Sequence, residues 1–183
     1  MSKLNRNEFL HCLVINARSL KNKLAELHEL MYRGDDSYDI ICITESWLNH
    51  TVSDAMLDPH NEFTVYRCDR NSVKIGGGVC VFIKRQLRVV KIDLPECFKL
   101  LECVCFDVFI QNDTIRVFNI YRSPGGCAST DKIIMQTLID CFNRYCTTDV
   151  TSLILGDLNC KNINWSELTA TNDFLQKKLF LTQ

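Results

Sequence analysis

The sequence lacks the long apolar run of a membrane-spanning helix and an excess of charge of either sign. No stretch approaches the roughly 20 consecutive apolar residues that a bilayer crossing needs, and residues 1–8 are too polar for a secretory signal. Lys+Arg number 21 against 22 Asp+Glu, for a formal net charge of −1. We therefore expect an intracellular, non-secreted protein with no membrane partner. A surface that binds a polyanion would have to be a local basic patch, because the net charge of the whole chain is close to zero.

Paired cysteines are also missing, although the chain has 11 cysteines. There is no Cys-x-x-Cys pair, and no cysteine is combined with histidine at zinc-site spacing. Most of the thiols, Cys12 and Cys42 among them, lie in apolar runs and are expected in the core, where free cysteine behaves as a small hydrophobic group. Without an export signal, disulfides are not expected. The sequence therefore predicts reduced thiols, and we interpret Cys103 and Cys105 as packing residues.

Apolar runs of strand length alternate with helical patterns along the 183 residues. Leu20, Leu24, Leu27 and Met31 recur at helical spacing after Ser19, a predicted N-cap. Because βα units mix with consecutive strands, the pattern favours one α/β domain with mixed sheets covered by helices. Strands are predicted at 10–15, 38–43, 63–67, 79–83, 100–110, 114–121 and 152–155, and further helices at 131–145 and 173–181. The strands 100–110 and 114–121 are joined by the turn 111–113 at hairpin spacing.

Polar side chains follow the last of these strands at an abrupt stop. The run 152–155 is predicted to be a fully buried strand; Gly156 ends it, and Asp157 and Asn159 follow. In an extended chain residues two apart point to the same side. Because sites in open α/β folds form at the carboxyl ends of strands, Asp157 and Asn159 are candidates for one site.

Three other predicted apolar strands also end at a residue with a polar side chain. Asn16, Glu45 and Tyr121 each terminate a predicted strand. If these strand ends share one rim with Asp157 and Asn159, they supply two carboxylates, two amides and a phenol, without a thiolate. Such oxygen donors suit Mg²⁺ or Mn²⁺, with substrate phosphates completing the coordination.

Five motifs in a fixed order carry a family resemblance. They are Asn16-Ala17-Arg18-Ser19-Leu20, Ile43-Thr44-Glu45-Ser46-Trp47-Leu48, Gly76-Gly77-Gly78-Val79, Tyr121-Arg122-Ser123-Pro124 and Gly156-Asp157-Leu158-Asn159. On these motifs the chain, over residues 10–183, resembles the endonuclease/exonuclease/phosphatase superfamily. More narrowly, it is similar to the apurinic-type endonuclease domain of non-long-terminal-repeat (non-LTR) retrotransposons.

The resemblance implies a four-layered α/β sandwich of two mixed β-sheets flanked by helices, as a single domain over 1–183. It implies that Glu45 is the main metal ligand, helped by Asn16, and that Asp157 orients and deprotonates the attacking water. Asn159 would position Asp157 or the phosphate, and Tyr121 would stabilise the developing charge. The implied reaction is metal-dependent nicking of DNA, next to a reverse transcriptase domain and in a nuclear or nucleocytoplasmic setting.

The chain departs from the family pattern after the last strand. The family's Asp-His pair does not occur, because the histidines are His11, His28, His50 and His60, all before Asp157. We therefore expect a C-terminally truncated domain with a nuclease-like fold and little or no activity. The alternatives are an inactive remnant of that domain and a superfamily phosphatase. In a smaller departure, Ser123 stands where this branch usually has proline.

Two further features leave alternatives open. The triple glycine at 76–78 is followed by neither a lysine nor a helix start, so it predicts a tight strand entry rather than a phosphate loop. A locally basic region either contacts DNA phosphates or guards a solvated sheet edge. Its members are Arg67, Arg70, Lys74, Lys84, Arg85, Arg88 and Lys91.

Overall fold

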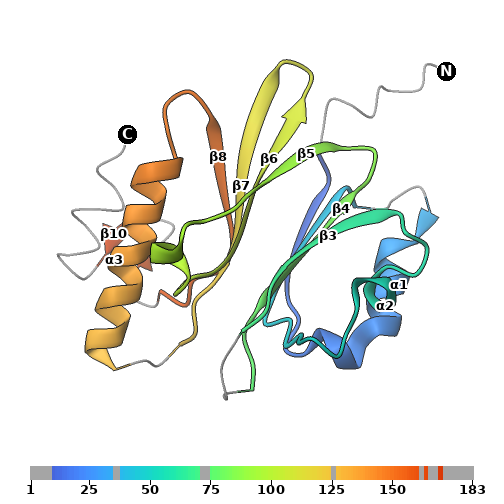
Figure 1. The fold of residues 1–183 in the computed structure, drawn as a ribbon, viewed down its shortest axis with the longest axis horizontal. Helices are drawn as coiled ribbons and strands as arrows, with labels where there is room; N and C mark the ends of the chain where they lie inside the picture. The colour runs from blue at the N-terminus through green and yellow to red at the C-terminus, as the bar shows by residue number, and fades with distance from the viewer. Residues whose placement is uncertain are drawn as a thin grey trace.

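Two four-stranded sheets stand face to face, with helices on both outer faces (Figure 1). The structure is a computed structural model that describes residues 10–34, 38–70, 75–124, 127–160, 163–164 and 169–170. The layers run from α3 through one sheet and then the other to α1 and α2. This confirms the predicted α/β sandwich of two mixed sheets. The helix predicted at 173–181 lies outside the described residues.

The first sheet has the strand order β1-β2-β4-β3. β1 (Cys12–Asn16) pairs in parallel with β2 (Ile40–Thr44), as expected when a helix connects two strands. β4 (Val79–Lys84) is antiparallel to both β2 and β3 (Phe63–Cys68). Every residue of β2 and β4 is buried, which fits the apolar runs 40–43 and 79–83 that make up most of them.

The second sheet has the order β5-β6-β7-β8. β6 (Glu102–Ile110) and β7 (Asp113–Tyr121) form the predicted hairpin, which turns at Gln111 with φ 52°. β8 (Thr151–Asp157) returns parallel to β7. β5 (Arg88–Ile92) pairs with β6 at the sheet edge; its short, charged sequence gave no strand signal.

Within the described residues, three helices and two 3-10 turns link the strands. The first helical pattern forms a 3-10 turn, η2 (Leu20–Lys23), followed by α1 (Leu24–Met31). The predicted cap is wrong in its chemistry: Ser19 adopts a left-handed conformation with φ 86° and makes no side-chain cap hydrogen bond. The remaining elements are α2 (Asp54–Leu57), η4 (Glu96–Phe98), α3 (Ala128–Tyr145) and the short strand pair β9 (Ile163–Asn164) and β10 (Thr169–Ala170).

Apolar side chains fill the space between the sheets and beneath the helices on both sides. Val79, Val81, Phe106 and Val108 belong to the central layer, while α1 and α3 cover the two outer faces. Asn119 crosses the centre: its fully buried side-chain amide donates to the backbone carbonyls of residues 43 and 80, at 3.1 and 3.3 Å. This polar bridge ties the second sheet to the first.

Two burial predictions are wrong. β8 was expected to be fully buried, but Leu153 is 39% exposed and Ile154 41% exposed. The reason is topological, because β8 pairs only with β7 within the described residues and is an edge strand there. Cys12, expected in the core, is exposed on β1, the edge strand of the other sheet. Among the described helices, none is long and apolar enough to cross a membrane.

Candidate active site

The register of the two parallel strand pairs brings the predicted site residues to one rim. Asn16 lies opposite Thr44, so Glu45 follows at the same level. In the other sheet Tyr121 lies opposite Asp157. Because the sheets pack face to face, both pairs end at the lower edge of the molecule in Figure 1. The rim therefore gathers side chains from both sheets.

Asn16 joins the two carboxylates of this rim. Its side-chain Nδ2 donates to Glu45 Oε1 at 2.8 Å and to Asp157 Oδ2 at 3.0 Å. One amide group thus holds carboxylates that are 112 residues apart in sequence and belong to different sheets. Its Oδ1 accepts from the backbone N–H of Arg18 at 3.3 Å, which orients the amide.

Glu45 is held by the backbone immediately after β2. It adopts a left-handed conformation with φ 51°, uncommon for a residue with a side chain. The following residues are pinned to the glycine triplet, as Ser46 N–H donates to Gly78 O at 3.1 Å and Trp47 N–H to Gly77 O at 2.9 Å. These bonds hold the turn that carries Glu45, and they confirm that the triplet makes a tight entry into β4.

Asp157 is held by a loop that locks onto Arg122. Its Oδ1 accepts from the backbone N–H of Asn159 at 3.1 Å. The Asn159 side chain donates to Arg122 O at 2.8 Å, and Arg122 NH1 donates back to the carbonyls of Leu158 and Asn159 at 3.3 and 3.0 Å. Both oxygens of Asp157 therefore have fixed donors, whereas the Asn159 amide is used within the protein.

Tyr121 ends β7 with its ring buried and its phenol at the rim. Burial, the charge of Glu45 and hydrogen bonding to Glu45 together raise the pKa of the Tyr121 phenol. The phenol therefore remains a protonated hydrogen-bond donor at neutral pH. All five predicted site residues thus lie on one rim, although Asn159 acts through its backbone on Asp157.

Sequence reasoning missed three residues that support this rim. Arg122 holds the Asp157 loop and pairs with Asp131 at 3.1 Å. Arg70 and Glu102 form an ion pair beside Tyr121, at 2.5 Å. Counting back along the hairpin from the predicted turn at 111–113 would have placed Cys103 opposite Tyr121, whereas the observed two-residue turn shifts the register by one residue and pairs Glu102 with Tyr121. Arg122 belongs to the tyrosine motif and Arg70 to the predicted basic region, but neither pattern indicated these contacts.

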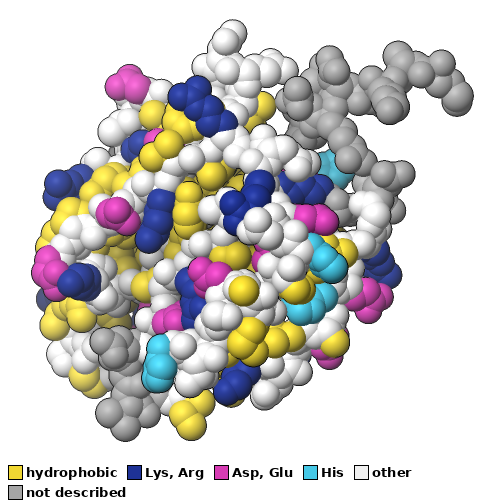
Figure 2. Space-filling model, turned by 45° about the vertical axis from the view of Figure 1, so that its right-hand side comes forward, with side chains coloured by type: hydrophobic (Ala, Val, Ile, Leu, Met, Phe, Trp, Pro, Cys, Tyr) yellow, Lys and Arg dark blue, Asp and Glu magenta, His cyan; other side chains and the backbone are white. Residues whose placement is uncertain are grey.

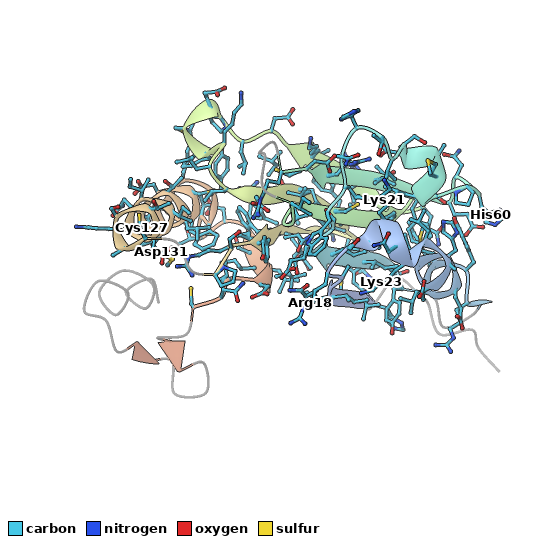
Figure 3. The ribbon with its side chains drawn as sticks, turned by 90° about the horizontal axis from the view of Figure 1, so that it is seen from below. Arg18, Lys21, Lys23, His60, Cys127 and Asp131 are labelled. Atoms are coloured by element: carbon cyan, nitrogen blue, oxygen red, sulfur yellow. The ribbon has the colours of Figure 1, made fainter. Side chains whose placement is uncertain are left out.

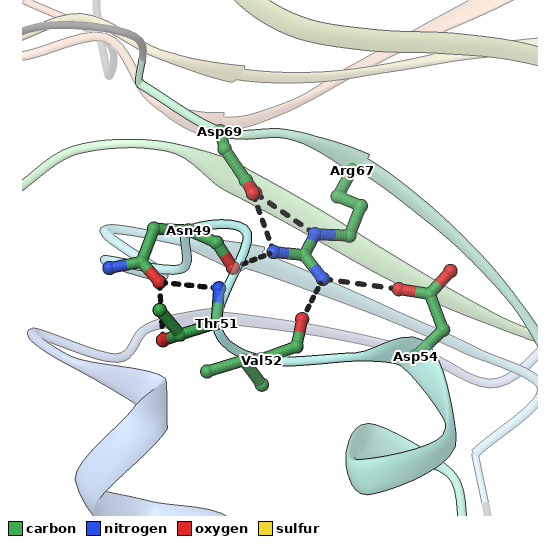
Figure 4. A network of polar contacts seen from close by, with 6 residues as sticks. All are labelled: Asn49, Thr51, Val52, Asp54, Arg67 and Asp69. Atoms are coloured by element: carbon green, nitrogen blue, oxygen red, sulfur yellow. Dashed lines mark hydrogen bonds and ion pairs between the residues drawn. The ribbon is translucent and has the colours of Figure 1, made fainter.

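The predicted basic region is partly used inside the protein. Arg67 binds the carbonyls of Asn49 and Val52 and pairs with Asp54 and Asp69, which clamps the segment after β2 to β3 (Figure 4). Arg88 and Lys91 lie on β5, which is an edge strand as the guarded-edge alternative supposes. Lys74 lies outside the described residues. On the face drawn in Figure 2, basic and acidic side chains are interspersed.

Arg18 is the exposed basic residue next to the site. It follows Asn16 and Ala17, with φ 44°. Seen from below, Arg18 lies near the middle of the molecule, between Cys127 and Asp131 at one end and His60 at the other (Figure 3). A cation in this place is available to a polyanionic substrate at the rim.

The donor set of the rim fits a hard divalent cation. Within the residues that the structure describes, no group of three or more His, Cys, Asp or Glu side chains is arranged to hold a metal. Mg²⁺, however, is commonly bound by one or two carboxylates and completes its shell with water and substrate phosphates. Glu45 and Asp157, brought together by Asn16, provide two such carboxylates.

Comparison with solved structures identifies the same fold in several nucleases. A Neisseria 3′ phosphatase, NExo, bound to a product DNA hairpin has a TM-score of 0.58 at 15% identity, covering 85% of this chain and 60% of that one. The AP endonuclease LMAP from Leishmania major gives 0.58 at 13% identity, covering 89% and 60%. The endonuclease domain of TRAS1, a telomere-specific non-LTR retrotransposon, gives 0.55 at 14%, covering 83% and 61%.

At these identities the likeness concerns the fold, and the chain spans about 60% of the length of the first two structures. No curated protein matches the sequence. The family-level comparison is decisive, because the sequence matches the Endonuclease/Exonuclease/phosphatase family over residues 13–174, most of the chain. The chain therefore belongs to the endonuclease/exonuclease/phosphatase family.

Proposed function

We propose that this chain is the metal-dependent endonuclease domain of a non-LTR retrotransposon and hydrolyses a phosphodiester bond of DNA. The observation that carries the proposal is the Asn16 bridge, which sets Glu45 and Asp157 side by side at the rim. Family membership supports phosphodiester hydrolysis in general. The five ordered motifs support the retrotransposon branch, and with it a reverse transcriptase as the partner domain.

The side chains have distinct roles in this proposal. Glu45 holds Mg²⁺ or Mn²⁺, with Asn16 fixing the carboxylate. When bound, the cation supplies charge neutralisation for the phosphate oxygens. Asp157, oriented by Asn16 and Asn159, accepts the proton of the attacking water. Tyr121 donates a hydrogen bond to the phosphate as negative charge develops there.

DNA is proposed as the substrate because the rim offers donors for phosphate oxygens and neighbours of this fold act on DNA. Arg18 and the Tyr121 phenol lie next to the carboxylate pair. The Neisseria relative is bound to a product DNA hairpin. The exposed Arg18 would attract a polyanion to the rim, where the cation would neutralise the carboxylates.

A second candidate function is DNA binding without cleavage. It is favoured by the positions of the histidines, since the family resemblance implies one at the phosphate. His11 lies at the opposite end of β1 from Asn16. His28 and His60 pack around Tyr32 beside α1. None of these three is at the rim.

Nicking of supercoiled plasmid by the purified chain with Mg²⁺ separates the two candidates. Glu45→Gln and Asp157→Asn each remove a charge at constant shape, and Asp113→Asn is the matched control at the exposed opposite end of β7. We expect each rim variant to lower the nicking rate by about 100-fold or more, and the control to nick at the rate of the parent chain.

Three other results have distinct meanings. Nicking that survives both rim substitutions would contradict the proposed site. Absence of nicking by the parent chain, with Mg²⁺-dependent DNA binding that Glu45→Gln weakens, would establish the second candidate. Absence of both activities would contradict the two candidates together.

A further inference from the structure

Arg70 is held at the rim by two residues that the proposed mechanism does not use. Its Nε donates to Glu102 Oε1 at 2.6 Å, and its NH2 donates to the hydroxyl of Ser123. The side chains of Arg70 and Glu102 are each only 18% exposed. A guanidinium bound from two sides and largely shielded from water has a fixed orientation.

The glycine triplet makes room for this guanidinium. A Cβ atom added to Gly77 would lie 2.2 Å from Arg70 Cζ, so a side chain at this position would displace the guanidinium. The backbone N–H of Gly78 donates to the second oxygen of Glu102. The triplet therefore shapes a seat for Arg70 and also orients the carboxylate that pairs with it.

The seat lies against Tyr121. Glu102 is the cross-strand partner of Tyr121 in the β6–β7 ladder, and Arg70 Cζ is 5.8 Å from the centroid of the Tyr121 ring. Ser123, which accepts from Arg70, is two residues beyond Tyr121. The guanidinium thus contacts the ring from one side and binds the segment that follows it, which restricts how the ring can tilt.

We propose that Arg70 is a positioning residue that holds the Tyr121 ring so that its phenol faces the Glu45–Asp157 pair. The inference rests on the proposed function for its kinetic consequence, although the contact itself is independent of it. It also gives Ser123 a role, because its hydroxyl binds Arg70 where a proline could not.

If Arg70 instead bound a substrate phosphate directly, its substitution would have a different kinetic effect. A phosphate contact would raise KM, lower the salt dependence of binding by about one charge and act independently of Tyr121. A positioning role affects kcat and requires the Tyr121 hydroxyl. If Arg70 has only a structural role, its substitution lowers the stability of the fold without a specific effect on kcat or KM.

The kinetic test compares Arg70→Met and Ser123→Ala with a matched control, Arg88→Met. Arg88 also lies over an aromatic ring, that of Phe109 at 4.7 Å, but on the edge strand β5. We expect Arg70→Met to lower kcat for plasmid nicking by about tenfold or more, with KM unchanged. In a Tyr121→Phe background the same substitution should have no further effect. Additive losses or a raised KM would overturn the proposal.

A second readout does not depend on activity. The chain has five tyrosines, so ¹³C-labelled tyrosine rings give a simple NMR spectrum in which Tyr121→Phe assigns the signal of Tyr121. We expect that signal to shift in Arg70→Met and to stay in place in Arg88→Met. An unmoved Tyr121 signal in a folded Arg70 variant would overturn the positioning role.

The two readouts keep the inference separate from the proposed function. If the parent chain does not nick DNA, the proposed function fails, and the NMR signal alone decides whether Arg70 orients Tyr121. If Arg70→Met does not fold, Arg70→Lys decides instead, because it keeps a positive charge beside Glu102 but lacks the planar guanidinium that binds Glu102 and Ser123 together.

Discussion

β2 and β8 both deliver a carboxylate to the rim, but they are held in place by different means. β2 lies between β1 and β4, and all of its residues are buried. β8 pairs only with β7 within the described residues, and Leu153 and Ile154 are 39% and 41% exposed. Glu45 thus follows a strand fixed by side-chain packing, whereas Asp157 ends a strand with little packing on its outer side.

The difference shows how the second carboxylate can be ordered without a buried strand. Gly156 lets β8 approach β7 closely, and Arg122, Asn159 and Asn16 then bind the end of the strand through hydrogen bonds. Backbone approach and polar contacts replace apolar burial there. We therefore expect β8 to be sensitive to a substitution that blocks its backbone approach to β7. We expect β2 to be more sensitive than β8 to the loss of an apolar side chain.

Gly156→Ala is expected to have the largest effect. Gly156 has φ +115°, and an added Cβ would lie 2.0 Å from the carbonyl oxygen of Ile120 on β7. Because that atom belongs to the backbone, β8 must move away, and we expect a loss of about 4 kcal/mol in unfolding free energy together with loss of nicking. Urea denaturation and the plasmid assay measure these effects.

Gly34→Ala is the matched control for this substitution. Gly34 also has a positive φ, +74°, but an added Cβ meets nothing within 4 Å. It should cost only about 1 kcal/mol of backbone strain. A Gly156→Ala variant no less stable than the Gly34→Ala variant would show that β8 is not held by its close approach to β7.

Isoleucine substitutions test the packing side of the comparison. Ile41 on β2 is fully buried against α1, and Ile154 on β8 is 41% exposed. We expect Ile41→Ala to cost about 3 kcal/mol and Ile154→Ala less than about 1 kcal/mol, measured by urea denaturation. Equal costs would mean that the outer side of β8 is covered in solution, and the contrast between the strands would be lost.

Apart from β5, the sequence predicted the strands of the two large sheets, and it predicted the mixed sheets and the five rim residues, because each leaves a local signal. An apolar run that ends in Asn16, Glu45, Tyr121 or Asp157 is visible without any knowledge of the fold. The β6–β7 hairpin was equally clear, since its turn at Gln111 separates two long apolar runs. The roles implied for these residues remain predictions.

Long-range geometry was beyond the reach of the sequence. The burial of 152–155 was wrong because an apolar run does not reveal whether its strand will be central or at an edge. The Arg70–Glu102 pair joins residues 32 apart through a sheet contact that no local pattern encodes. The Ser19 cap failed because the residue's type matched a cap while its left-handed backbone, φ 86°, did not.

The cysteines of the packed strands and those at the surface are expected to differ in chemical reactivity. Burial raises the pKa of Cys42 on β2 to about 12, whereas hydrogen bonds from Ser129 and Thr130 lower the pKa of the exposed Cys127 thiol, just before α3, to about 7. A lowered pKa means that the thiolate fraction of Cys127 rises as pH passes through about 7, and the thiolate is the reactive form.

We therefore expect iodoacetamide to alkylate Cys127 well before Cys42, with a rate midpoint near pH 7, followed by peptide mass spectrometry. Replacing the donors in a Ser129→Ala, Thr130→Val variant should move the midpoint to higher pH, because the thiolate loses the hydrogen bonds that stabilise it. An unmoved midpoint would show that these hydroxyls do not stabilise the thiolate. Alkylation of Cys42 at the same rate would mean that β2 opens readily. It would contradict the conclusion that side-chain packing holds β2 in place.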